Sequence, residues 1–212
     1  MIYKDRRDAG RKLAEELAHY RDKPDIVVLG LPRGGVPVAC EIAVVLHCPL
    51  DILIVRKIGV PGNPELAAGA ICETGTVVFN NDIIKIYGVS KEYLEWETTR
   101  QKREIVRRIN LYRGGKGISS LAGKTVILVD DGVATGATIK AAISSLANER
   151  IARLVVALPV ASQEAEQELE TMVDELVCPQ APAGFMAVGN YYYDFTQVED
   201  EEVITMLKQT AT

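Results

Sequence analysis

The sequence predicts an α/β protein in which helices flank a central, mostly parallel sheet, and three observations support this class. Apolar runs such as 26–29 and 126–129 are typical of parallel strands that are buried on both faces. Each run leads through a small-residue turn into a segment with helical spacing, as expected of parallel strands joined by helices. The 212 residues are 48% hydrophobic and contain no linker or low-complexity tract, so we expect one domain over 1–212.

Hydrophobic spacing assigns the elements in order along the chain. Apolar residues recur every three to four positions in the expected helices, as at Leu13 and Leu17, whereas the expected strands are continuous apolar runs. The expected helices cover residues 8–20, 36–46, 89–112, 139–146, 163–172 and 198–207. The expected strands cover residues 26–29, 50–55, 126–129, 154–158 and 175–177, with a short hairpin over 70–79.

The most informative stretch is the turn after the expected strand 126–129. This strand ends in Asp130 and Asp131, and small residues then lead into a helix. Ligands bind beyond the carboxyl ends of strands in open α/β sheets, where small residues let backbone N–H groups close around a phosphate. Carboxylates repel a phosphate but accept hydrogen bonds from hydroxyls, so the pattern predicts a phosphorylated sugar, with helix capping as the alternative. The residues expected at this sugar phosphate are Asp130, Asp131, Gly132, Ala134, Thr135, Gly136, Ala137 and Thr138.

A second Gly-rich turn follows the expected strand 26–29. It consists of Pro32, Arg33, Gly34 and Gly35, at the start of a helix. Paired glycines permit a close backbone approach, and an arginine supplies a forked donor that matches an oxyanion. We therefore expect a second anion here, and the alternative is an ordinary Gly-Gly turn with a solvent-facing arginine.

At these residues the chain resembles the type I phosphoribosyltransferases, whose motif is an apolar strand, two acidic residues and a Thr-Gly-rich loop, here VILVDDGVATGAT. The resemblance covers a core of about 24–160, and the ends are similar to an uncharacterised bacterial subgroup. It implies the fold of these enzymes, with a helical insertion at about 90–116 and a small hood from 178–212 that also involves the N-terminal helix. It also implies that the Asp-Asp loop binds the 5-phosphate of phosphoribosyl pyrophosphate (PRPP) and that residues 32–35 bind its pyrophosphate.

A third segment, 55–70, starts with Arg56 and Lys57 and continues into a stretch rich in Gly, Pro and Asn. This composition predicts a mobile flap, and the resemblance implies a flexible loop that closes over the substrate and excludes water. Arg56 and Lys57 are then expected to stabilise the departing pyrophosphate. The alternative is a surface loop with two solvated cations.

The resemblance implies a reaction in which a ring nitrogen of a nucleobase displaces pyrophosphate at the anomeric carbon of the ribose, as in purine salvage. A 6-oxopurine is preferred because Arg33-Gly34-Gly35 is similar to the loop of bacterial xanthine–guanine enzymes. Mg²⁺ is expected to be held mainly by PRPP, with Asp130 or Asp131 reaching it indirectly. Two alternatives are a PRPP-sensing regulatory protein that binds nucleic acid and a hydrolase of a ribose phosphate compound.

The C-terminal segment 182–195 concentrates aromatic residues in a chain with only 6% of them, so we expect the base to bind there. Aromatic faces stack on heterocycles, and an acidic side chain reads an exocyclic edge. The alternative is that these rings pack the C-terminal helix onto the sheet. The candidate base-binding residues are Phe185, Tyr192, Asp194 and Phe195.

Composition restricts the remaining functions. A net charge of −5 disfavours a general nucleic-acid binder, and the four cysteines lack the spacing of a zinc site or a disulfide framework. The N-terminus has no apolar signal segment, and no apolar run reaches the roughly 20 residues of a membrane span, so we expect a cytoplasmic protein without a membrane partner. The resemblance implies a homodimer.

Overall fold

The computed structural model describes residues 2–209, apart from the side chain of Glu65, so the last three residues of the expected 178–212 hood lie outside the described part. The chain forms two compact units, which we describe separately. The described parts of Met1–Ile52, Ile118–Gly136 and Glu149–Thr212 make the first unit, and Leu53–Gly117 with Ala137–Asn148 make the second.

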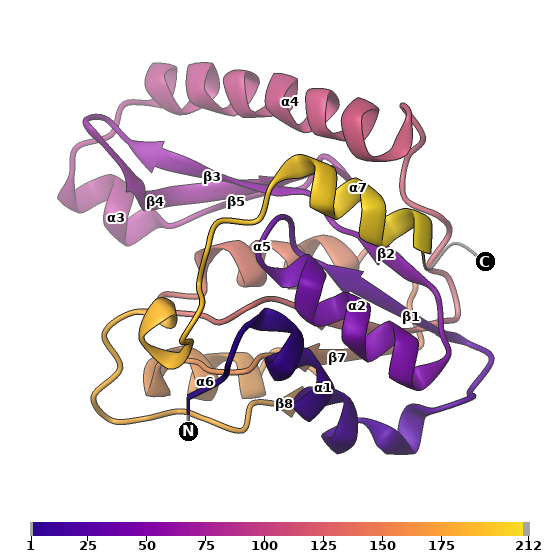
Figure 1. Ribbon diagram of the computed structural model, residues 1–212. Helices are drawn as coiled ribbons and strands as arrows, with labels where there is room; N and C mark the ends of the chain where they lie inside the picture. The colour runs from indigo at the N-terminus through magenta and orange to yellow at the C-terminus, as the bar shows by residue number, and fades with distance from the viewer. Residues whose placement is uncertain (1, 210–212) are drawn as a thin grey trace. The chain divides into compact units, whose positions relative to one another are not determined.

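The first unit contains a sheet of five strands, all parallel (Figure 1). In spatial order they are β2 (Leu50–Ile52), β1 (Ile26–Gly30), β6 (Thr125–Val129), β7 (Arg153–Ala157) and β8 (Glu175–Val177). Every residue of β1 is buried, as expected of a parallel strand covered on both faces. The predicted α/β class is confirmed, but the predicted strand 50–55 ends at Ile52, because the N–H of Ile54 bonds to the Glu73 carboxylate (2.8 Å).

The helices of the first unit are α1 (Arg6–Glu16), α2 (Gly35–Leu46), α6 (Gln163–Glu170) and α7 (Asp200–Gln209), with single 3-10 turns at Ala18–Tyr20 and Val188–Tyr191. The side chain of Asp5 caps α1 by accepting the N–H of Asp8 (2.7 Å), so α1 begins before the predicted residue 8. Helix α2 is apolar on most of its surface because it contacts β1 on one side and both α1 and α7 on others.

The irregular C-terminal segment 178–199 also belongs to the first unit and joins the N-terminus of the chain. The N–H of Tyr3 donates to the carbonyl of Tyr191 (2.8 Å), and the N–H of Tyr193 donates to the carbonyl of Tyr3 (2.9 Å). Tyr3 and Tyr192 therefore pair in parallel as an isolated bridge, and both rings are buried together with Ala9. The N-terminal residues and the expected hood segment thus form one continuous piece of structure.

The second unit contains a three-stranded antiparallel sheet of β3 (Val55–Val60), β4 (Asn63–Cys72) and β5 (Val77–Phe79). Its helices are α3 (Asn81–Ile86), α4 (Lys91–Arg113) and α5 (Ala137–Leu146). The predicted hairpin at 70–79 is present, but the loop predicted at 55–70 is instead the hairpin β3–β4. Two glycines of these strands allow close strand approach. A Cβ at Gly69 would lie 2.5 Å from the carbonyl oxygen of Val78 in β5, and one at Gly59 would lie 2.6 Å from the Cα of Pro64 in β4.

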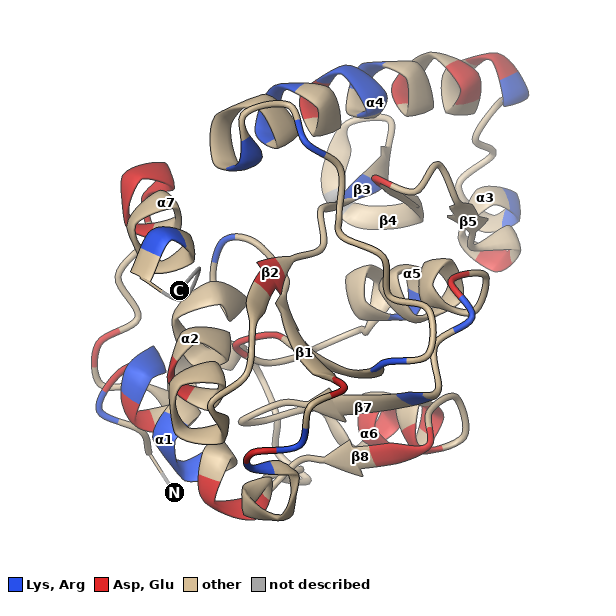
Figure 2. Ribbon diagram, turned by 90° about the vertical axis from the view of Figure 1, so that its right-hand side faces the viewer, with Lys and Arg blue, Asp and Glu red and all other residues tan. Residues whose placement is uncertain are grey.

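Helix α4 matches the predicted long polar helix and packs on β3 and β4. Ser90 caps it by accepting the N–H of Tyr93 (3.2 Å), and Gly114 ends it with a positive φ of 59°. Lys and Arg are interspersed with fewer Glu along its length (Figure 2), and ion pairs form within the helix at Lys91–Glu95, Arg100–Glu97, Arg107–Glu104 and Arg108–Glu104.

Candidate functional site

The two Gly-rich turns singled out in the sequence lie side by side in the first unit. Strands β1 and β6 pair in parallel from Ile26 beside Thr125 to Gly30 beside Val129, so the turns that follow them meet at one edge of the sheet. A Cβ at Gly34 would lie 2.0 Å from Oδ2 of Asp131. The Arg-Gly-Gly turn is therefore in direct contact with the Asp-Asp turn, and this contact requires glycine.

Asp130 and Asp131 form a desolvated carboxylate pair at this contact. The N–H of Asp131 donates to Oδ1 of Asp130 (2.9 Å), and Nε of Arg6 donates to Oδ2 of Asp131 (2.7 Å). Burial raises the pKa of Asp130 well above its usual value, and the neighbouring carboxylate of Asp131 adds to this. Burial also raises the pKa of Asp131, although the guanidinium of Arg6 opposes the rise. A partly buried pair of acceptors of this kind suits the hydroxyl groups of a sugar diol.

The raised pKa of Asp130 gives a stability prediction. The folded state binds this proton more tightly than the unfolded chain, so the free energy of unfolding falls as pH rises above the ordinary aspartate pKa of about 4. The variant Asp130→Asn is expected to be more stable than wild type at pH 7, by about 1 to 3 kcal/mol, with the gain vanishing near pH 4. Urea unfolding at both pH values measures this, and a loss of stability at pH 7 would contradict it.

The loop that follows the aspartates leaves its tip accessible. Ala134 and Thr135 are exposed. The hydroxyl of Ser162 donates to the carbonyl of Ala134 (2.7 Å) and fixes the backbone of the loop at that residue. Gly136 has a φ of 75°, a conformation that favours glycine. The turn predicted to bind a phosphate therefore exposes Ala134 and Thr135, while Gly136 is buried, and Ala137 and Thr138 begin α5 in the second unit.

Tyr192, a predicted base contact, instead supports the Asp-Asp loop. Its hydroxyl donates to the carbonyl of Asp131 (2.5 Å), and the residue is only 6% exposed. The centre of its ring lies 5.6 Å from that of Tyr3 and 5.0 Å from that of Phe195. Burial raises the pKa of Tyr192, which keeps the hydroxyl protonated as a donor. The low exposure of Tyr192 leaves little of its ring surface free for a base.

The other candidate base contacts have partly exposed positions. Phe185 is half-buried and stacks on Tyr191 (5.6 Å, 11° between planes), whereas the ring of Phe195 is 36% exposed and lies under the guanidinium of Arg6 (3.9 Å). Asp194 is exposed, and hydrogen bonds from Thr196 lower the pKa of its carboxyl.

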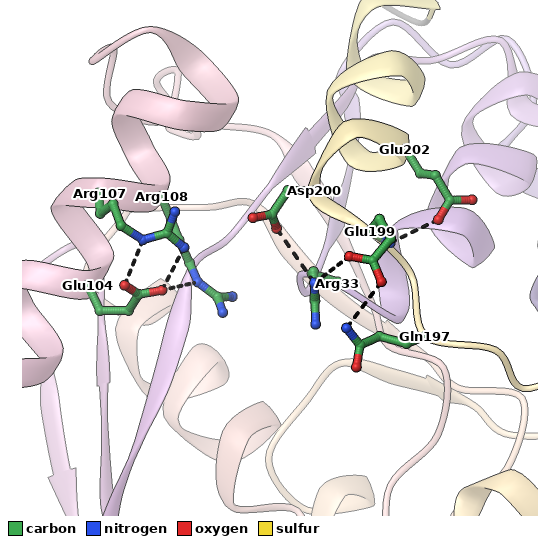
Figure 3. Close-up of polar contacts among 8 residues, drawn as sticks. All are labelled: Arg33, Glu104, Arg107, Arg108, Gln197, Glu199, Asp200 and Glu202. Atoms are coloured by element: carbon green, nitrogen blue, oxygen red, sulfur yellow. Dashed lines mark hydrogen bonds and ion pairs between the residues drawn. The ribbon is translucent and has the colours of Figure 1, made fainter.

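Arg33 meets an acidic partner that the sequence did not indicate. Its guanidinium lies 3.6 Å from Oε2 of Glu199 and 3.9 Å from Oδ1 of Asp200, at the start of α7 (Figure 3). Nε2 of Gln197 donates to the carboxylate of Glu199 (3.2 Å), and the backbone N–H of Glu199 donates to the carboxylate of Glu202 (2.8 Å). Two carboxylates of the chain therefore lie against the side chain expected to bind pyrophosphate.

Arg56 and Lys57 belong to β3 and thus to the second unit, whereas Asp130 and Asp131 belong to the first. Nε of Arg56 donates to Gln101 of α4 (2.9 Å), whose amide donates to the buried carboxylate of Glu97 (2.7 Å). Burial lowers the pKa of Arg56, and the positive charge of Arg108 adds to this. A polar chain from α4 thus orients this guanidinium.

A further charged group on α4 is centred on Glu104. It binds Arg107 and Arg108 through short ion pairs, which lower its pKa to about 2 (Figure 3). Arg108 therefore pairs with Glu104 within the helix, and its positive charge also acts on Arg56.

Asp130 and Asp131 fit a magnesium ion that is shared with a substrate, because Mg²⁺ usually takes one or two carboxylates and substrate oxygens. Within residues 2–209, no three His, Cys, Asp or Glu side chains come together as a metal cage of their own. In the same residues, no helix has the length and apolar character needed to cross a membrane.

Comparison with known proteins shows a similarity that covers nearly the whole chain and not only the two turns. Residues 2–195 match the family described as the phosphoribosyl transferase domain. Two Mycobacterium tuberculosis proteins that carry a provisional phosphoribosyl transferase name are 44% identical over 206 residues, which are 97% of this chain and 46% of each relative. The chain thus spans about half the length of these relatives.

Solved structures agree with the fold. The crystal structure of TT1426 from Thermus thermophilus is 46% identical, covers 100% of both chains and has a TM-score of 0.84. The structure of the AQ2163 protein from Aquifex aeolicus shares the fold at 13% identity, over 83% of this chain and 74% of that one, with a TM-score of 0.51.

Proposed function

The chain belongs to the phosphoribosyl transferase family, and on that premise we propose that it transfers the 5-phosphoribosyl group of PRPP to a nucleobase and releases pyrophosphate. The observation that carries this proposal is the contact between Gly34 and Asp131 at neighbouring strand ends. This contact supports one ligand with a sugar phosphate on the Asp-Asp loop and a pyrophosphate on the Arg-Gly-Gly turn.

We assign the ribose diol to Asp130 and Asp131, the 5-phosphate to the turn 132–136, and the pyrophosphate to residues 32–35. The reaction passes through a sugar with cationic character, so most of the catalysis is positioning and charge stabilisation. The two carboxylates favour that cationic sugar over the neutral ground state. We also propose that Arg56 and Lys57 stabilise pyrophosphate as its negative charge develops.

Mg²⁺ is the proposed cofactor, with Asp130 and Asp131 as the carboxylates that contact it through water. When bound, the ion neutralises part of the pyrophosphate charge. The desolvated pair has the residue types for this role, and PRPP oxygens would complete the coordination.

The proposed acceptor is a 6-oxopurine, on the strength of the Arg33-Gly34-Gly35 turn. Phe195 and Phe185 offer partly exposed aromatic surface near the loop that carries Asp194, which supports base binding by this segment. A homodimer in the cytoplasm, without nucleic acid as a partner, completes the proposal.

The decisive test is pyrophosphate release from Mg²⁺–PRPP in the presence of single purine, pyrimidine and other heterocyclic bases, with a no-base control. Release that requires one base would establish transfer and name the acceptor. Equal release without a base would indicate a hydrolase, and PRPP binding without any release would indicate a sensor.

The acidic start of α7 gives a prediction for pyrophosphate binding. Because Glu199 and Asp200 lie against Arg33, the double variant Glu199→Gln, Asp200→Asn should bind inorganic pyrophosphate about 2- to 10-fold more tightly, the scale of two partly exposed ion pairs. Glu201→Gln, in the same helical turn, is the matched control and should change nothing. Calorimetric titration measures both, and an equal gain in the control would refute a specific effect at Arg33.

A further inference from the structure

We propose that Arg6 is a positioning residue of the ribose site, which holds the carboxylate of Asp131 in the orientation that accepts the ribose diol. This inference rests on the proposed function, because it gives Arg6 a role only if Asp131 binds the sugar. Nothing in the sequence indicated such a role, since Arg6 stands at the start of an amphipathic helix among other charged residues.

The contact is short and largely buried at both ends. Nε of Arg6 lies 2.7 Å from Oδ2 of Asp131, and the two side chains are 11% and 14% exposed. Hydrogen bonds to charged partners in such surroundings are strong and directional. Arg6 bonds to a single oxygen of the carboxylate through Nε, so Asp131 keeps acceptor capacity for a hydroxyl.

The guanidinium also connects the ribose site to the C-terminal segment. One terminal nitrogen of Arg6 donates to the carbonyl of Thr196 (2.8 Å), and the guanidinium carbon lies 3.9 Å from the centre of the Phe195 ring. Tyr192 holds the same loop by its bond to the carbonyl of Asp131. One side chain of α1 therefore orients both the sugar-binding carboxylate and the segment proposed to face the base.

Helix α1 provides a rigid base for this arrangement. Arg6 is its first residue, directly after the capping residue Asp5, and Ala9 and Leu13 are fully buried against the rest of the unit. The next residue, Arg7, is exposed and pairs with Glu41 (2.9 Å). The two arginines are adjacent in the same helix and each pairs with a carboxylate, but only Arg6 contacts Asp131, so Arg7 is a matched control.

The test compares ribose 5-phosphate, 2-deoxyribose 5-phosphate and inorganic pyrophosphate by calorimetric titration of the full chain. Arg6→Met should weaken ribose 5-phosphate binding by roughly 10- to 100-fold and reduce its advantage over the 2-deoxy sugar, because the effect acts through the diol. Pyrophosphate binding should change less than about 3-fold, since it uses the other turn. Arg6→Lys should recover part of the loss, and Arg7→Met should bind like wild type.

The outcomes separate the possible failures. If Arg6→Met and Arg6→Lys both retain wild-type affinity for ribose 5-phosphate, the positioning role is overturned while the proposed function stands. An equal loss for all three ligands would also overturn it, because that result shows a general structural defect. If wild type itself binds neither ribose 5-phosphate nor PRPP, the proposed function fails and this inference fails with it. Thermal unfolding of each variant identifies misfolding. If Arg6→Met does not fold, the affinity of Arg6→Lys for ribose 5-phosphate decides whether Arg6 positions Asp131.

Discussion

The double variant Asp130→Asn, Asp131→Asn is expected to lose PRPP binding, with affinity at least about 100-fold weaker than wild type. Each aspartate would lose a charge-assisted hydrogen bond to a ribose hydroxyl, and such bonds contribute about 1.5 to 3 kcal/mol each. The change would also remove the negative charge that favours a cationic sugar in the transition state. Calorimetric titration with Mg²⁺–PRPP measures the effect.

A loss of binding by this variant is separable from a loss of folding. Asp130→Asn replaces a carboxyl whose pKa is raised by burial, whereas Asp131→Asn weakens the ion pair with Arg6, so the fold of the double variant has to be measured directly. Circular dichroism and the urea midpoint of the variant serve as the control. Wild-type affinity for PRPP in a folded double variant would refute the assignment of the ribose to this pair.

The second large effect is expected from Gly34→Ala. The φ of Gly34 is −62°, which any residue adopts, so this glycine is required for space: an added Cβ would lie 2.0 Å from Oδ2 and 2.6 Å from Cγ of Asp131. The carboxylate must move away, and with it the hydrogen bond to Arg6. A displacement of about 1 Å in a site of this kind can reduce activity about 100-fold, and we expect a PRPP transfer rate lower by that amount.

Gly117→Ala is the matched control for this substitution, because a Cβ there meets nothing within 4 Å and the residue lies outside both turns. We expect it to retain the wild-type rate and stability. If Gly34→Ala also retains the wild-type rate, the close contact between the two turns has no part in the reaction.

Much of this architecture is predictable because the strands carry strong local signals. After their first residues, Thr125 and Arg153, strands β6 and β7 are as apolar as β1 and have no polar residue to place on a solvated face, which predicts a buried parallel sheet. The two turns were identified from residue types alone. Their direct contact was implied by neither turn and follows from the pairing of β1 with β6.

Other features had no local signal. The glycines of segment 55–70 indicate a loop, whereas Gly59 lies in β3 and Gly69 in β4, where neighbouring backbone comes too close for a side chain. Arg6 and Tyr192 reach the Asp-Asp loop from opposite ends of the chain, over sequence separations of 125 and 61 residues. Contacts of that range depend on the tertiary fold, and an arginine in a charged helix start gives no indication of them.

On the proposed function, the two adjacent turns hold one ligand by both of its ends. The most direct test of this is calorimetric titration of the wild-type protein with PRPP, ribose 5-phosphate and inorganic pyrophosphate, each with Mg²⁺. If both ends bind at once, PRPP should bind at least about 100-fold more tightly than either fragment, since joining them makes the second contact intramolecular. Equal affinities for PRPP and one fragment would show that only one of the two turns binds the ligand and would refute simultaneous binding of both ends.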